Sequence, residues 1–453
     1  MSDLRLFPEP DETIVGVSQL LRDRQLRCVD VLQRCLGRID EYEGAVNAWV
    51  SIDREGALAQ AEALDRELAE GWSRSALHGI PIGVKDIVNV QGVATAAGSD
   101  LLAQSTAEKD AFLVARLREA GAVILGKTVT TQFACFDPPV TRNPWNNQRT
   151  PGGSSSGSAA AVASGMCLGA IGSQTGGSIT RPASFCGVAG CKPTFARVSV
   201  DGVFPLAHSL DHPGPFARCV PDLAMLLDVI SPHNPGDPLS AHMPPLELSQ
   251  TLEPEPDMFP QLGRVRGLFD ERAEQPVLQA LDRALHTLEA AGATVVETQL
   301  PEAFDDVLQC HRTIMLGELA ALHETRHAEH SGDYQPGVKS LIEEGLSIPA
   351  TQYVRSRRHQ ERLEREITPC FGDLDVLVCP ATTSAAPDPS TTGDPAFNAP
   401  WSYLGLPTIS FPIGLSDDGL PLAIQLIGRP FDEPGLFIAA IWCEHAIRNA
   451  LRD

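Results

Sequence analysis

The chain has 453 residues, of which 43% are apolar and 21% charged, and its formal net charge is −23 at pH 7. This length and composition are typical of a folded protein with a large core. The acidic charge repels phosphate backbones and anionic membrane surfaces, so we expect no nucleic-acid or membrane partner. The N-terminal residues lack a basic start and an apolar run, and no stretch of 18 apolar residues occurs, which predicts a cytoplasmic protein.

Residues 1–70 are expected to form N-terminal helices. Apolar residues recur at three- and four-residue spacing over 13–22 and 28–42, as on one face of a helix. Residues 54–68 are rich in Ala, Leu and Glu, which favour the helical state.

Strand and helix patterns alternate over residues 78–228. The clearest buried strands are 84–90, 122–125 and 168–171, and 110–120 is a predicted helix. Such alternation is typical of a parallel or mixed sheet that helices cover on both faces.

The second half of the chain is less regular. Residues 231–260 are rich in Pro, His and acids and predict an irregular connection, whereas 263–300 return to a strand-helix-strand pattern with its helix at 277–291. Residues 312–368 are predicted to be mostly helical. Residues 380–412 are loop-rich, and Trp401 and Tyr403 there either line a pocket or pack under the loop.

The eleven cysteines form no recognisable pattern. Apart from Cys186 and Cys191 they stand singly among apolar residues, without the spacing of a disulfide framework or of zinc-binding pairs. Buried, reduced thiols are therefore expected.

Two serine-bearing turns form the most distinctive feature of the sequence. Residues 152–158 read GGSSSGS and residues 174–178 read QTGGS, and a helix of small residues at 159–166 is expected between them. Core packing does not require such a run of hydroxyl residues, so we expect the two turns to bring serine hydroxyls together at one pocket.

Lys85 is a candidate base for those serines. It follows the apolar stretch GIPIGV, and burial disfavours an ammonium ion, so its pKa should fall toward neutrality. The alternative is a lysine whose amine extends from a strand end to water.

Together these segments resemble the amidase signature family of serine hydrolases. The resemblance covers most of the chain and includes residues 79–86, 126–128, 143–145, 149–155, 176–178, 182–183, 186–187, 192–194, 209–211, 214–215, 217–218, 419–421 and 425–428. It implies one α/β domain over residues 1–453, with a large mixed, twisted β-sheet covered by helices on both faces. Residues 78–228 would hold the catalytic core, and 312–368 a helical cap over the substrate entrance.

The resemblance also implies roles for individual residues. Ser178 would be the nucleophile, Ser154 a bridging serine on a cis peptide, and Lys85 the base. The oxyanion would be held by the backbone N–H groups of Thr175, Gly176, Gly177 and Ser178. Two neighbours of Ser154, namely Gly153 and Ser155, would support the site. No metal or organic cofactor is required by this chemistry.

Substrate-binding candidates come from two places. Many members have Asp where this chain has Gln174, and their arginine stands one position earlier than Arg181; this shift resembles the malonamidase-like branch, in which that arginine contacts an acidic substrate. Alternatively, Arg181 satisfies buried carbonyls beneath the turn. The loop carrying Phe133, Ala134 and Cys135 is a second candidate, since family members place it beside the scissile carbonyl.

Two short motifs suggest other enzymes. Residues 153–157 match the nucleophile elbow of α/β-hydrolases, but the elbow needs a preceding strand, and residues 143–151 cannot form one. Residues 121–128 match a phosphate-binding loop, yet 122–125 is itself the predicted strand, so we regard that match as accidental.

A zinc hydrolase is a further alternative. His323 and His327 lie four apart in the sequence HETRH, a spacing that can bind zinc on a helix. The segment is heavily charged and offers no strong third ligand beyond His330, so a solvated helix face is the preferred interpretation.

The sequence therefore predicts an amidohydrolase that cleaves linear amide C–N bonds in small molecules, with carbamates (urethanes) and aryl anilides as additional substrates. Two further alternatives stay open besides zinc: the amidase subunit of a tRNA-dependent amidotransferase, which needs partner subunits, and a catalytically inactive binding relative. A homodimer also stays open as an assembly of this chain.

Overall fold

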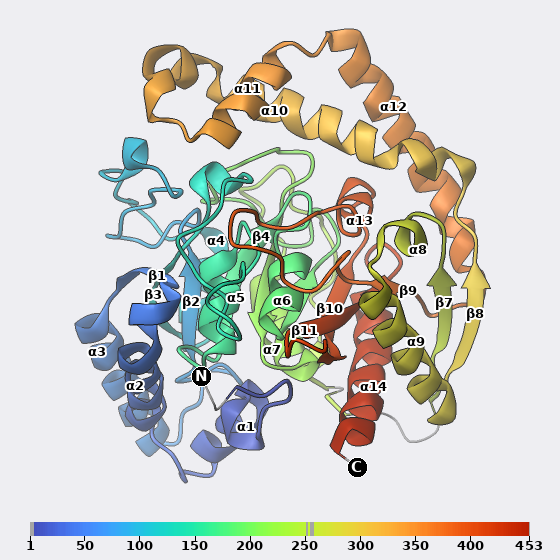
Figure 1. Cartoon of the computed structure of the whole chain (residues 1–453). Helices are drawn as coiled ribbons and strands as arrows, with labels where there is room; N and C mark the ends of the chain where they lie inside the picture. The colour runs from blue at the N-terminus through green and yellow to red at the C-terminus, as the bar shows by residue number, and fades with distance from the viewer. Residues whose placement is uncertain (1–3, 251, 254–257, 453) are drawn as a thin grey trace.

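A mixed β-sheet runs through the middle of the molecule. The computed structural model describes residues 4–250, 252–253 and 258–452, and the eleven strands within them follow the order β1-β3-β2-β4-β6-β5-β10-β11-β9-β7-β8 (Figure 1). The strand bounds are β1 Trp49–Ile52, β2 Pro81–Lys85, β3 Val123–Thr128, β4 Gly169–Gln174, β5 Ala189–Lys192, β6 His212–Ala217, β7 Gln261–Val265, β8 Thr294–Thr298, β9 Val376–Pro380, β10 Thr408–Leu415 and β11 Pro421–Ile427.

Helices cover both faces of this sheet. A Cβ added at Gly169 would lie 2.8 Å from Leu226, whereas one added at Gly172 would lie 2.7 Å from the Ser155 hydroxyl. Residues three apart on a strand face opposite sides, so α7 and the start of α5 lie on opposite faces, as predicted. The helix bounds are α1 Ile14–Arg22, α2 Cys28–Val46, α3 Arg54–Ala69, α4 Phe112–Glu119, α5 Ser156–Ala163, α6 Thr180–Cys186, α7 Val220–Ile230, α8 Leu268–Arg272, α9 Gln275–Ala290, α10 Val307–His330, α11 Pro336–Leu346, α12 Ala350–Ile367, α13 Ala399–Tyr403 and α14 Glu433–Arg452.

The parallel strands β2 and β4 bring Lys85 and the 174–178 turn to the same edge of the sheet. Strand β2 pairs in parallel with β3 and with β4, and Val84 lies opposite Ile171. The carboxyl ends of parallel strands meet at one edge of a sheet. Lys85 at the end of β2 therefore lies near the end of β4, where the 174–178 turn begins.

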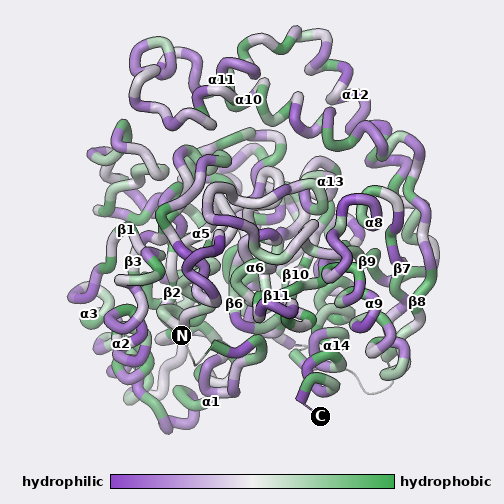
Figure 2. The backbone as a smooth tube through the Cα atoms, in the orientation of Figure 1, coloured by the Kyte–Doolittle hydropathy of each residue, from purple (hydrophilic) through white to green (hydrophobic). Residues whose placement is uncertain are grey.

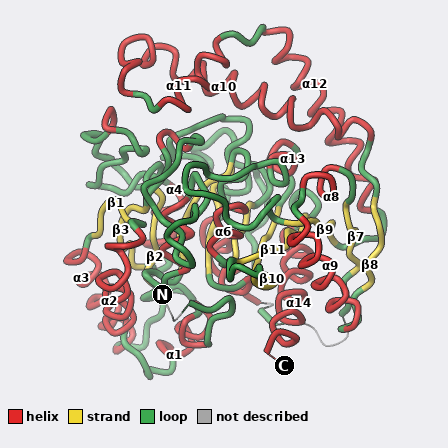
Figure 3. The backbone as a smooth tube through the Cα atoms, viewed as in Figure 1, coloured by secondary structure: helices red, strands yellow, loops and turns green. Residues whose placement is uncertain are grey.

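Helices α10, α11 and α12 form a cap across the top of the molecule in Figure 1. Helix α10 packs on α11, α12 and α13, and loops fill the space between the cap and the sheet (Figure 3). Hydrophilic and hydrophobic residues alternate along the cap (Figure 2), as expected for helices with one buried face. Among the described residues, no helix combines the length and apolarity needed to cross a membrane.

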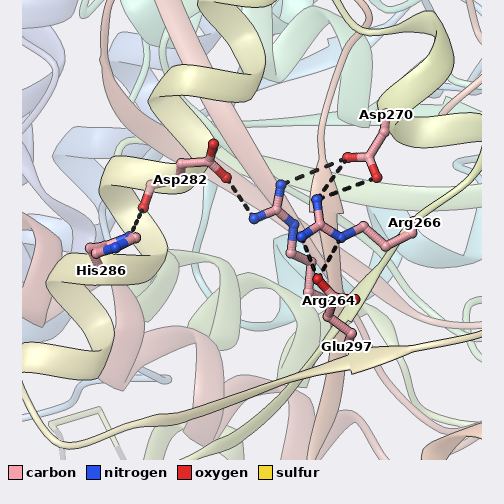
Figure 4. A network of polar contacts seen from close by, with 6 residues as sticks. All are labelled: Arg264, Arg266, Asp270, Asp282, His286 and Glu297. Atoms are coloured by element: carbon pink, nitrogen blue, oxygen red, sulfur yellow. Dashed lines mark hydrogen bonds and ion pairs between the residues drawn. The ribbon is translucent and has the colours of Figure 1, made fainter.

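The edge of the sheet far from Lys85 is joined by ion pairs. Arg264 at the end of β7 and Arg266 just after it connect that strand to its neighbours (Figure 4). Arg264 pairs with Asp282 and Asp270, Arg266 pairs with Asp270 and Glu297, and His286 approaches the Asp282 carbonyl. Most of these partners are solvent-exposed, so we assign the network a local structural role.

Several predicted boundaries were wrong. The strand predicted at 84–90 ends at Lys85, because the N–H groups of Ile87 and Val88 both donate to the Lys85 carbonyl and turn the chain. The strand predicted at 122–125 extends to Thr128, so Lys127 and Thr128 are the last residues of β3. The N-terminal region also contains strand β1, antiparallel to β3, which helical spacing alone did not predict.

The remaining elements lie close to their predicted places. The cap begins at Val307, five residues before the predicted start. Residues 231–250 contain only a short 3-10 turn at Leu248–Gln250, and part of the predicted connection, residues 251 and 254–257, lies outside the described residues. Trp401 and Tyr403 are fully buried, and Trp401 stacks on Phe269, so they pack under the loop.

Candidate active site

Lys85 lies at the centre of a cluster of serine hydroxyls. Its side chain is 0% exposed, and Nζ lies 2.8 Å from Ser154 Oγ and 2.9 Å from Ser173 Oγ. Burial lowers the pKa of Lys85 to about 7, and the nearby Asp211 carboxyl opposes part of this shift. A substantial fraction of Lys85 is therefore neutral near pH 7 and able to accept a proton.

Ser154 is held by a closely packed backbone just before α5. The Gly153–Ser154 peptide is cis, and the Gly153 carbonyl accepts a hydrogen bond of 2.8 Å from Arg181 Nη2. A Cβ at Gly153 would lie 2.8 Å from Thr392 Cγ2, so glycine is required for this close approach.

Ser178 occupies the only opening in a buried stretch of chain. Every residue from Met166 to Thr194 is buried except Ser178, which is partly exposed. It stands between β4 and α6, in a turn whose Gly177 could not carry a Cβ without approaching Asn398 Oδ1 to 2.6 Å. The arrangement leaves one serine partly exposed while its neighbours fix the backbone.

The side chain of Gln174 supports this turn from inside the protein. Its Oε1 accepts hydrogen bonds from the N–H groups of Ile179 and Thr180 at 2.8 and 2.9 Å, and its Nε2 donates to Ser402. Gln174 is fully buried. The structure therefore does not place Gln174 in contact with a substrate. Its side-chain amide instead holds the start of α6.

Thr175 is fixed from two sides. Its hydroxyl donates to the Asp211 carboxyl, and its carbonyl accepts from His311 Nε2 at 2.9 Å. The N–H groups of Leu206 and Ala207 also donate to Asp211, whose pKa burial raises to about 6. His311 belongs to α10, so the cap contacts the turn that carries Ser178.

Ser155 lies against the backbone of Ser173. Its hydroxyl donates to the Ser173 carbonyl and accepts from the Ser173 N–H, both at 3.2 Å. Ser173 Oγ in turn lies 2.9 Å from Lys85 Nζ. Ser155 therefore helps to position Ser173, the second hydroxyl group beside the lysine.

The three consecutive candidates Phe133, Ala134 and Cys135 lie in different surroundings. The Phe133 ring is 0% exposed and packs against His323 and Tyr334 under the cap, so it does not line an open pocket. Ala134 lines a cavity of about 10 Å³ beside Ser173, Thr175 and Asp211. The Cys135 thiol is buried, which raises its pKa and keeps it protonated.

Arg181 lies beneath the turn. It is 1% exposed, and besides the Gly153 carbonyl its Nη2 contacts Thr392 Oγ1 at 3.3 Å. These contacts match the alternative in which the arginine satisfies a buried carbonyl. Its Nε and Nη1 have no hydrogen-bond partner among the described residues, and Nη1 would lie 3.1 Å from a Cβ at Gly177.

His323 does not lie on a solvated helix face, so that prediction was wrong for this residue. It is fully buried, its Nδ1 lies 3.0 Å from the Tyr334 hydroxyl, and burial lowers its pKa to about 4. The described part of the chain holds no group of three or more His, Cys, Asp or Glu arranged to hold a metal ion. The zinc alternative therefore lacks a ligand set.

Three residues near the site were not predicted: Ser173, Asp211 and His311. Ser173 directly precedes the QTGGS turn, and the hydroxyl-rich sequence offered a signal for it. Asp211 lies in residues 209–211, one of the segments that resemble the family, but no role was predicted for it. His311 lies in the cap, where the sequence gave no local indication of its long-range partner Thr175.

The sequence profile of the Amidase family matches residues 30–437. The chain belongs to the amidase family. All eleven cysteines of this amidase-family enzyme are free, and all are buried as predicted except Cys310 and Cys370, which are partly exposed.

Relatives of this amidase-family protein carry several names. It is 34% identical to a subunit of the glutamyl-tRNA(Gln) amidotransferase of Thermosynechococcus vestitus, over 93% of this chain and 95% of that protein. It is 36% identical to an amidase of Pseudomonas putida, over 96% of both chains. The crystal structure of the native peptide amidase from Stenotrophomonas maltophilia is 31% identical and covers 96% of this chain and 97% of its own, with a TM-score of 0.85.

Proposed function

We propose that this protein hydrolyses linear amide C–N bonds through an acyl-enzyme on Ser178. The observation that carries the proposal is the buried Lys85 amine, whose pKa lies near 7 and whose Nζ is 2.8 Å from Ser154 Oγ. A neutral amine beside a hydroxyl is the starting point for general-base activation of a serine.

In the proposed reaction, Lys85 accepts the Ser154 proton as Ser154 accepts that of Ser178. The Ser178 oxygen then attacks the substrate carbonyl and forms a tetrahedral intermediate. Backbone N–H groups of residues 175–178 stabilise its oxyanion, because their turn is held rigidly before the reaction begins. The protons return along the same path to the leaving amine, which departs and leaves the acyl-enzyme. Water then attacks with Lys85 again as the base.

The proposed substrates are small amides, with carbamates and aryl anilides as further candidates. The names of two relatives, an amidase and a peptide amidase, support the amide part of this proposal. Arg181 is a secondary candidate for a substrate contact, because Nε and Nη1 have no protein partner in the described part of the chain. No step requires a metal or organic cofactor.

A substrate panel tests the proposal. Short aliphatic amides, p-nitroanilides and aryl carbamates would be assayed with the wild-type protein and with Ser178→Ala. We expect Ser178-dependent hydrolysis of at least one amide. Turnover of every substrate at equal rates by both proteins would contradict the nucleophile assignment.

A second candidate function is that of the amidase component of a tRNA-dependent amidotransferase. It is favoured by the 34% identity to a subunit of a glutamyl-tRNA(Gln) amidotransferase. Gln174 and the shifted Arg181 argue against it, since both depart from the commoner family pattern. Glutamine in the same panel separates the two: hydrolysis of glutamine only when partner subunits are present would favour the amidotransferase.

A further inference from the structure

A second cavity lies at the end of the sheet opposite the Lys85 site. Its volume is about 450 Å³, within the range of small-molecule sites. It touches Leu168, just before β4, and Arg218, just after β6, whereas the 174–178 turn follows the other end of β4. Five residue steps along the strand, at roughly 3.4 Å each, separate the two ends by about 17 Å.

The walls of this cavity carry an excess of positive charge. Four arginines and two carboxylates line it: Arg5, Arg34, Arg38, Arg218, Asp11 and Glu12. Asp11 lies 3.6 Å from Arg34, and Glu41, outside the lining, lies 3.4 Å from Arg38. Arg5 pairs at 2.9 Å with Glu9, which is also outside the lining, and the Glu12 carboxylate accepts the Glu9 N–H. A positive lining in a chain of net charge −23 marks this cavity as unusual.

Arg218 is the deepest of these arginines. It is 7% exposed, and its Nη2 donates to the Arg5 carbonyl at 3.2 Å. Its Nε is buried without a hydrogen-bond partner, and no carboxylate of the described residues lies within 4.0 Å of its guanidinium nitrogens. The Glu12 and Asp222 carboxylates attract this guanidinium without an ion pair to it, and its Nε–H has no acceptor. A bound anion would supply that acceptor and a closer counter-charge.

The rest of the lining is apolar. Val17 and Val31 come from α1 and α2, and the buried residues Cys35, Cys167 and Leu168 complete the wall. A bare inorganic ion would leave this surface uncovered, whereas a short hydrocarbon chain would cover it and gain burial free energy.

We propose that this cavity binds a small organic anion, with its carboxylate or phosphate group on Arg218 and Arg38 and a short apolar chain along Val17, Val31 and Leu168. The planar guanidinium of Arg218 suits a carboxylate or phosphate, since two N–H groups can contact two oxygens. The proposal is independent of the chemistry at Ser178.

Calorimetry with hexanoate, hexyl phosphate, acetate and inorganic phosphate tests this site. Because an amidase active site also accepts a carboxylate product, the titrations use protein in which Ser178 has been blocked covalently, or Ser178→Trp protein if the serine resists labelling. We expect saturable binding of hexanoate or hexyl phosphate, and these two arms distinguish the carboxylate from the phosphate source. Each methylene should tighten binding by up to about fourfold, so acetate should bind more weakly than hexanoate.

Variants assign the binding to the cavity. Arg218→Gln should weaken hexanoate or hexyl phosphate binding about tenfold or more, because it removes a buried charge-assisted contact. Arg38→Gln provides a second test if Arg218→Gln fails to fold, since Arg38 is the other proposed contact and its side chain is 29% exposed, and it should weaken binding several-fold. The matched control is Arg312→Gln, which removes an exposed arginine paired with Glu344 on the cap and should leave affinity unchanged.

The following outcomes would overturn the proposal: no saturable binding of either six-carbon anion, equal affinities for acetate and hexanoate, or the same loss of affinity in Arg38→Gln and Arg312→Gln.

Discussion

The 174–178 turn and the helical cap differ in how tightly their surroundings hold them. In α6, which follows the turn, all seven residues are buried, whereas in α12 of the cap only four of eighteen are. Helix α12 instead presents a charged surface to water. Substitutions around the turn should therefore disturb neighbouring side chains, whereas most substitutions in the cap should change only side chains that face water.

The glycines show this contrast only at the surface of the cap. A Cβ at Gly172, in β4, would lie 2.5 Å from Phe216, and one at Gly332, between α10 and α11, would meet nothing within 4 Å, but one at Gly345, where α11 packs on α10, would lie 2.2 Å from the Leu316 carbonyl oxygen. The cap contacts the site through a few polar groups: His311 bonds the Thr175 carbonyl, and Glu318 accepts from Ser209. We infer that the core sets the chemistry and that the cap adjusts the position of the turn.

The largest expected effect comes from Ser178→Ala. It should lower kcat/KM by at least about 10³-fold, because the attacking oxygen is lost, while thermal unfolding stays close to wild type. A fluorophosphonate probe followed by peptide mass spectrometry should place the label on Ser178. A label on Ser155 would instead revive the nucleophile-elbow interpretation.

Lys85→Ala should rank next, with a loss of about 10²- to 10⁴-fold from removal of the general base. Lys85→Arg should not restore activity, because a guanidinium stays protonated at working pH.

The pH profile of the wild type tests the same assignment. Since the pKa of Lys85 is lowered to about 7, the amine is charged below that pH and neutral above it, so kcat/KM should rise through this region and level off at alkaline pH. Near-normal activity of Lys85→Arg with an unchanged profile would show that Lys85 is only a structural cation.

Ser154→Ala should be less damaging than Ser178→Ala, by our expectation about a hundredfold in kcat/KM, because water can partly replace the bridging hydroxyl. The change removes one of the two hydroxyls on Lys85 Nζ and leaves Ser173 in place. Ser173→Ala is the matched control, since it removes the other hydroxyl. Equal losses in the two variants would argue that both serines only position the lysine.

Sequence patterns brought out short local segments of the core but not the long-range contacts of the cap, for a physical reason. Lys85, Ser154 and Ser178 lie in short segments whose small residues and glycines leave few alternative structures, so local patterns carried the information. The pairing of His311 with Thr175 joins residues 136 positions apart, and the burial of His323 depends on Tyr334 and Phe133. Such contacts follow from tertiary packing, which helical spacing does not encode.

Individual side chains in the core illustrate the same limit. The sequence marks Gln174 as unusual. Only the N–H groups of Ile179 and Thr180, which donate to its side chain, show that Gln174 holds the start of α6. The end of β2 depended on hydrogen bonds to the Lys85 carbonyl. The apolar residues beyond it continued the pattern of a strand and concealed the turn.

A smaller effect is expected from His311→Ala, which removes the hydrogen bond between the cap and the Thr175 carbonyl. Loss of one such bond should lower kcat about tenfold through a shift of the turn, with little change in KM. His311→Gln keeps an N–H donor and should recover part of the loss. A change in KM alone, with no rescue by Gln, would indicate that His311 contacts substrate instead.

The smallest effect on activity should come from His323→Ala and His327→Ala. His323 is buried against Phe133 and Tyr334, so its removal should reduce stability by about 1–3 kcal/mol, whereas His327 is partly exposed and should matter less. Because the described residues offer no set of three metal ligands, kcat/KM should change no more than about threefold in either variant. A chelator should likewise leave activity unchanged. Stoichiometric zinc in the purified protein, with activity lost on its removal and restored on its return, would contradict this expectation. The chemistry would then lie in the cap and not at the 174–178 turn.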